Sequence, residues 1–164
     1  MKKEVPDMSH DQQVIVELRE EIEQFGVAIC AGEIEACEAG MQVRRWSTHY
    51  TVGLTRHEGH PEVIVVDMCC DCAERVLSAV ADVVSGGARL GPGWGLQIDG
   101  WDYLLIDVDD PTLLPGVQEV YRPSGGPAVP ALQVIGTDEE GDFPWESGIG
   151  ADSLLGPVPR ALWA

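Results

Sequence analysis

Two short segments concentrate the side chains that could do chemistry. The first covers residues 50–62 and reads Y-T-V-G-L-T-R-H-E-G-H-P-E, and the second covers residues 138–146 and reads D-E-E-G-D-F-P-W-E. Each places polar side chains on a glycine- and proline-shaped loop beside an apolar run, which is how a rigid scaffold commonly presents a site. The candidate ligand-binding residues in the two segments are Tyr50, Arg56, His57, His60, Glu62, Asp138, Trp145 and Glu146.

The His60-Pro61-Glu62 sequence could form an acid–base or metal-binding pair. Pro61 biases His60 toward an extended backbone, so His60 and Glu62 should project to the same side. An imidazole beside a carboxylate suits proton transfer or metal binding. The structural alternative is a locked turn, in which His60 bonds to backbone and Glu62 pairs with Arg56.

The second segment could form one wall of a pocket. Trp145 offers a large apolar surface and one N–H donor, while Asp138 and Glu146 could receive a cationic or hydroxylated ligand. The structural alternative is a loop held over a sheet by its aromatic residues. We predict that the two segments lie side by side, so that His60, Glu62, Asp138 and Glu146 share one pocket.

A cysteine cluster, Cys69-Cys70-Asp71-Cys72, follows an apolar strand and begins a helix. The spacing of Cys69 and Cys72 is that of a dithiol redox motif, and a helix N-terminus lowers the pKa of a thiol. A zinc site needs about four ligands, and His57 or His60 would have to complete it. Five cysteines is an odd number, and we predict that all are reduced and that the chain binds no metal or cofactor.

The hydrophobic pattern predicts the elements that carry these segments. Apolar residues recur at three- and four-residue steps in the two expected helices, and Asp99-Gly100 between apolar runs predicts a hairpin. We expect helices at 11–25 and 72–84, the second capped by Asp71, a short helix within 111–121, an acidic loop after 31, and strands at 27–31, 44–54, 63–66, 94–98, 101–108 and 129–135. The fold class is α+β, a mixed and mainly antiparallel sheet with two or three helices packed on one face.

Chain length and hydropathy predict one domain. The 164 residues divide into a flexible N-terminal arm (1–9), a single α+β domain (10–150) and an extended C-terminal tail (151–164). No apolar run reaches the ~18 residues of a membrane span. The first residues lack the apolar stretch of a signal peptide. We therefore expect a cytoplasmic protein.

The charge balance restricts the partners. Twenty-eight acidic residues against ten basic ones give a net charge of −18, which would repel nucleic acid. An acidic surface can serve solubility alone, or it can attract a basic protein partner.

With these motifs placed, the chain resembles the bacterial family catalogued as domain of unknown function 4262, which is common in actinobacteria. The likeness covers about residues 25–149 and rests on stretches 50–54, 59–62 and 132–134, on Asp138 and on 143–146. The resemblance implies a soluble bacterial protein of one domain, without an established activity. Cysteines at 69–72 are not expected in that family, so a function of these residues would be particular to this protein.

Three classes of function are open at this point. We favour a small binding or accessory protein, of the immunity type for instance, whose acidic surface meets a protein partner. The first alternative is an enzyme or small-ligand binder that uses the two segments, and the second is a thiol redox protein that uses Cys69 and Cys72. The sequence does not indicate an oligomeric state.

Overall fold

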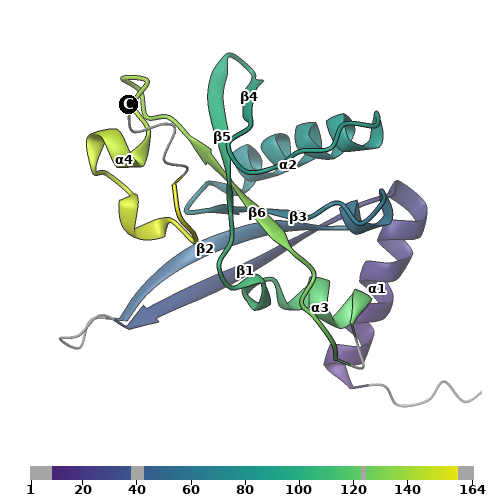
Figure 1. Ribbon diagram of the computed structural model, residues 1–164. Coiled ribbons are helices and arrows are strands. Elements are labelled where there is room, and N and C mark those ends of the chain that lie inside the picture. Colours follow the sequence, from purple (N-terminus) through teal and green to yellow (C-terminus); the bar gives the residue numbers. More distant parts are fainter. Residues whose placement is uncertain (1–8, 38–42, 123–124, 159–164) are drawn as a thin grey trace, which may run out of the picture.

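The computed structural model describes residues 9–37, 43–122 and 125–158. Its centre is a six-stranded sheet in which every neighbouring pair is antiparallel except β3 and β6, which run parallel (Figure 1). Across the sheet the strands are β1 (Ala28–Cys37), β2 (Val43–Val52), β3 (Glu62–Val66), β6 (Ala131–Gly136), β5 (Trp101–Asp107) and β4 (Gly95–Ile98). The single parallel pair decides where the two candidate segments lie.

The first strand is longer than the sequence indicates. An acidic loop is expected after residue 31, but β1 continues to Cys37 and pairs with β2 along its whole length. Ile34 is buried between the exposed Glu33 and Glu35, which is the alternation of a strand with one face on the core. Arg45 on β2 lies 2.9 Å from Glu35 and offsets part of the charge on this edge strand.

One face of the sheet is covered by α2 (Cys70–Ser85). Its buried residues fall at three- and four-residue steps and pack against Val63, Val65, Leu132 and Val134. The helix begins earlier than expected, because Cys69 rather than Asp71 is its N-cap residue. A side chain at the N-cap can accept from the N3 backbone N–H, and the Cys69 sulfur does so.

The opposite face is covered by α1 (His10–Phe25), α3 (Pro115–Tyr121) and the short α4 (Pro144–Ser147). Leu18 and Ile22 of α1 pack with Ile64 of β3, and Val117 of α3 joins the same cluster. Thus three helices share one face and α2 covers the other (Figure 1). The α+β class with a mixed, mainly antiparallel sheet is confirmed.

The described part of the tail is docked on the sheet. The buried side chain of Gln133 on β6 donates to the Ser153 carbonyl at 2.9 Å and accepts from the Leu155 amide at 2.7 Å. The Leu155 carbonyl in turn accepts from the amide of Asp109. The expected N-terminal arm lies outside the described residues except for Ser9, which caps α1, and so do residues 159–164 of the expected tail.

Within the described residues, no helix combines the length and the low polarity that a membrane crossing requires.

Candidate functional site

Glu62 is the most densely bonded polar side chain of the first segment. It is fully buried at the start of β3. Its Oε2 accepts hydrogen bonds from Thr51 Oγ1 at 2.7 Å and from the Leu54 amide at 3.2 Å. Its Oε1 accepts from the amides of Gly53 and Thr55, at 2.9 and 3.0 Å, and from the Thr55 hydroxyl at 2.9 Å. Five protein donors therefore surround this carboxylate.

The backbone around Gly53 is shaped to deliver these donors. Gly53 has a φ of +139°, and a Cβ there would lie 2.7 Å from the Gly26 carbonyl oxygen. Only glycine adopts this conformation at low cost. The turn then leads into a 3-10 helix, η1 (Leu54–Arg56), whose first amides point at Glu62. The Thr51 hydroxyl also accepts a hydrogen bond from the Val63 amide at 2.9 Å. The segment therefore both donates hydrogen bonds to β3 and accepts one from it.

His60 is also fully engaged. Its ring is buried, with Nδ1 2.7 Å from the Pro61 carbonyl oxygen and Nε2 accepting from the Leu90 amide at 2.9 Å. A carbonyl can only accept and an amide N–H can only donate, which fixes the tautomer with the proton on Nδ1. Neither ring nitrogen is free to hold a metal or to move a proton to a ligand.

Arg56 and His57 lie beside Glu62 and His60 in the chain, but their side chains form no hydrogen bond with either residue among the contacts of the described residues. Arg56 donates to the Ile22 carbonyl at the end of α1 at 3.0 Å, and lies 3.9 Å from Glu23. The expected pairing of Arg56 with Glu62 is replaced by these contacts. His57 is half-buried and ends η1, and its carbonyl accepts from the His60 amide.

Tyr50 ties the sheet to α3. Its hydroxyl accepts a hydrogen bond from the Gly116 amide at 3.0 Å and forms a second hydrogen bond with the Cys30 thiol. Burial raises the pKa of Tyr50 to about 12, with the neighbouring Cys30 adding to the effect. Burial likewise raises the pKa of Cys30 to about 11, against the lowering effect of the Tyr50 hydrogen bond. Both groups are therefore neutral at ordinary pH and serve packing.

The second segment is a loop fastened over the sheet. Trp145 stacks on Phe143, with ring centroids 4.7 Å apart and planes 10° from parallel, and both pack against Leu104, Ile106 and Ile135. Glu146 accepts from the Phe143 amide at 2.8 Å and so caps α4. Asp138 Oδ1 accepts from the amides of Glu140 and Asp142 and shapes the turn.

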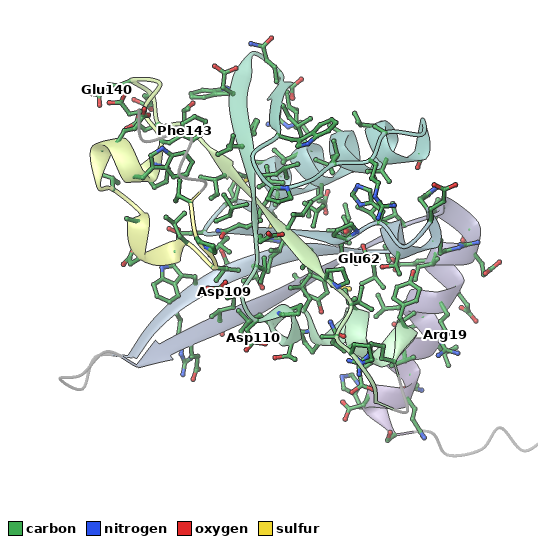
Figure 2. All side chains as sticks on the ribbon, in the orientation of Figure 1. Arg19, Glu62, Asp109, Asp110, Glu140 and Phe143 are labelled. Atoms are coloured by element: carbon green, nitrogen blue, oxygen red, sulfur yellow. The ribbon has the colours of Figure 1, made fainter. Side chains whose placement is uncertain are left out.

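The two segments do not meet. β3 and β6 are parallel and Glu62 pairs with Ala131, so the start of β3 lies beside the start of β6. The second segment follows the far end of β6, five residues on, which is roughly 17 Å along a strand. Figure 2 shows Glu140 and Phe143 at the opposite end of β6 from Glu62. The prediction that His60, Glu62, Asp138 and Glu146 share one pocket is therefore wrong.

A group of three carboxylates in the second segment has metal-like spacing. Ligand oxygens of Asp138, Glu140 and Asp142 lie within 4.8 Å of one another, and oxygen ligands suit calcium or magnesium. Asp138 Oδ2 is buried and accepts no hydrogen bond from the described residues. Exposed acidic groups of this kind are common without an ion, so spacing alone assigns no metal here.

The comparison with protein families identifies the family of this chain. Residues 21–150 match the family described as Domain of unknown function (DUF4262). The chain belongs to this family. No curated protein and no solved structure matches it. The matched range of the DUF4262 domain holds both segments and the whole sheet, and it brings no assigned activity.

A shallow groove lies in the DUF4262 domain between α2 and the β4–β5 hairpin. It has a volume of about 540 Å³. Four carboxylates and one guanidinium line it, from Asp71, Glu74, Asp82, Asp99 and Arg75. The uncharged lining residues are Ser78, Ala79 and Ile98. Arg75 lies 3.8 Å from Asp99, which leaves the groove with an excess of negative charge. Sequence reasoning missed it because its two walls are distant in sequence.

The cysteine cluster lies at one end of this groove. Cys69 and Cys70 are exposed and Cys72 is half-buried, and all three are free thiols. Asp71 and Arg75, which are in the groove lining, neighbour Cys72 on the first turns of α2. The predicted thiol pair is therefore accessible, whereas Cys30 is half-buried under α1 and α3.

Proposed function

We propose that this protein is a binding protein that docks a basic segment of a partner protein in the groove between α2 and the β4–β5 hairpin. The acidic lining of this groove carries the proposal. Asp71, Glu74 and Asp82 stand along one helix face, and Arg75 is the only cation among the described residues that line it. A concave surface of one charge sign concentrates ligands of the opposite sign.

The hairpin adds apolar contact area to the charged helix. Ile98 lines the groove, and its cross-strand partner is Trp101. Cross-strand partners project to the same face of a sheet, so Trp101, which is 47% exposed, stands beside Ile98. Aromatic residues of this kind frequently dominate the binding energy of protein interfaces.

The internal bonding of the first segment supports the same conclusion. Glu62 and His60 are saturated by protein partners, so the acid–base pair suggested by the sequence has no free proton acceptor to offer a substrate. With the two segments at opposite ends of β6, the small-ligand alternative loses its shared pocket. We propose further that the protein works in the bacterial cytoplasm, in keeping with its family resemblance.

The test compares two variants with the same change in net charge. Glu74→Lys/Asp82→Lys reverses the groove, and the matched control Glu17→Lys/Glu20→Lys reverses two exposed acids of α1. A partner captured from the source cells at low salt is purified, and its dissociation constant is measured by calorimetry for each variant at two salt concentrations. We expect the groove variant to lose about tenfold or more in affinity and the control much less, with wild-type affinity falling as salt rises.

Two outcomes would overturn the proposal. Equal losses in both variants would show that only the net charge matters. Capture of nothing at low salt, together with a metabolite that raises the melting temperature, would favour a small-ligand binder instead.

A further inference from the structure

Cys69 and Cys72 form a preorganised pair at the first turn of α2. Cys69 is the N-cap residue, with an extended backbone (φ −61°, ψ 151°). Its sulfur accepts from the Cys72 amide at 3.3 Å, and the two thiols hydrogen-bond to each other. A three-residue step returns to the same side of a helix. The two sulfurs are therefore neighbours on the first turn of α2.

The two thiols differ in the way that a nucleophile and a resolving thiol differ. Hydrogen bonds from the Cys72 thiol and then from its amide lower the pKa of Cys69, which is exposed to solvent. The same thiol–thiol bond, with Cys69 as acceptor, raises the pKa of Cys72. Arg75 favours the thiolate form of both cysteines. An accessible thiol of lowered pKa is the type that attacks disulfides, whereas a buried one is inert.

We propose that Cys69 and Cys72 are a redox-active dithiol that reduces disulfides by thiol–disulfide exchange. The Cys69 thiolate attacks one sulfur of a substrate disulfide, forming a mixed disulfide and releasing the other half as a thiolate. Cys72 loses its proton to that thiolate or to solvent and attacks the Cys69 sulfur. The Cys69–Cys72 bond closes, the second half of the substrate leaves as a thiolate that takes up a proton from water, and two electrons have passed from the protein to the substrate.

The surroundings select the charge of the substrate. Asp71 lies between the two cysteines in sequence, and Glu74 and Asp99 line the adjoining groove. An anionic disulfide such as oxidised glutathione would be repelled by these carboxylates, whereas a cationic disulfide would be attracted. The substrate class is therefore a neutral or cationic disulfide. This site does not depend on the proposed partner protein.

The test uses small disulfide probes on the reduced full chain. Cystamine is cationic, hydroxyethyl disulfide is neutral and oxidised glutathione is anionic, and peptide mapping by mass spectrometry locates each new bond. We expect cystamine to produce a Cys69–Cys72 disulfide fastest and oxidised glutathione slowest, with the difference shrinking at high salt.

Serine variants separate the roles of the three neighbouring cysteines. Cys72→Ser should stop at a mixed disulfide on Cys69, because no resolving thiol remains. Cys69→Ser keeps an N-cap acceptor for α2 and should abolish the rapid reaction. The matched control Cys70→Ser changes an exposed thiol and should react as the wild type does.

One distribution of products would overturn the proposal. Mixed disulfides spread evenly over Cys69, Cys70 and Cys72 in the wild type, without a Cys69–Cys72 bond, would show ordinary surface thiols. Circular dichroism of each variant checks that α2 is retained. Because no partner protein enters the experiment, its failure leaves the binding proposal standing.

Discussion

Thr51 Oγ1 lies 2.7 Å from Glu62 Oε2, in the buried space where β2 ends and β3 begins. The same hydroxyl accepts from the Val63 amide. Through this pair, the turn that follows β2 is bonded to the strand beside it. A buried carboxylate is stable in a protein when its oxygens are saturated with donors, and Glu62 meets that condition through neighbours in the turn.

Glu62→Gln should destabilise the protein severely. The glutamine nitrogen cannot accept a hydrogen bond, so in either orientation of the amide at least two of the five donors around residue 62 lose their acceptor. We expect the free energy of unfolding to fall by about 3 kcal/mol or more, measured by urea denaturation.

The exposed Glu58 provides the control for this measurement. Glu58→Gln should change the free energy of unfolding by less than about 0.5 kcal/mol. A loss below about 1 kcal/mol in Glu62→Gln would show that the carboxylate is not a structural acceptor and would reopen a catalytic role.

His60→Phe should free the loop that carries Leu90. The ring nitrogen that accepts from the Leu90 amide is removed while the aromatic volume stays. We expect a loss of about 2 kcal/mol and faster hydrogen exchange at the Leu90 amide, followed by NMR. His57→Phe, at a half-buried neighbour, should leave that amide protected. Unchanged protection in His60→Phe would contradict the role assigned to the ring.

Tyr50 should make stability fall at alkaline pH. The hydroxyl keeps its proton to about pH 12 in the folded protein, against an ordinary pKa of 10.0. Above pH 10 the unfolded chain therefore releases a proton that the folded chain retains, so the stabilisation is present below pH 10 and is lost as pH rises toward 12. Tyr50→Phe should show a shallower loss of unfolding free energy over this range, measured under reducing conditions. Parallel curves for the two proteins would argue against a raised pKa.

Gln133→Met should release the docked tail. Methionine fills a similar volume but cannot hold the Ser153 carbonyl and the Leu155 amide. We expect chymotrypsin to cut after Leu154 or Leu155 much faster than in the wild type, while the sheet stays folded. Gln97→Met, at an exposed position of β4, is the matched control. Equal cutting rates in the two variants would show that Gln133 does not hold the tail.

Local sequence patterns were sufficient for several elements. Asp99-Gly100 produces the β4–β5 turn with both residues at positive φ, as the hairpin signal predicts. The apolar steps of residues 76, 77, 80 and 84 reappear as the buried face of α2. The acidic residues in the second half of β1 led to the prediction of a loop. This half is a strand because it pairs with β2, and its own composition does not indicate that pairing.

The sequence by itself determined the class of the fold, the family motifs and the spacing of Cys69 and Cys72. These are local properties, set by periodicity, turn chemistry and adjacent residues. Only the tertiary structure decided that Glu62 and His60 are saturated inside the protein, and that the two motif segments lie apart. The reason is the parallel pairing of β3 with β6, a long-range contact that places the start of one strand far from the end of the other.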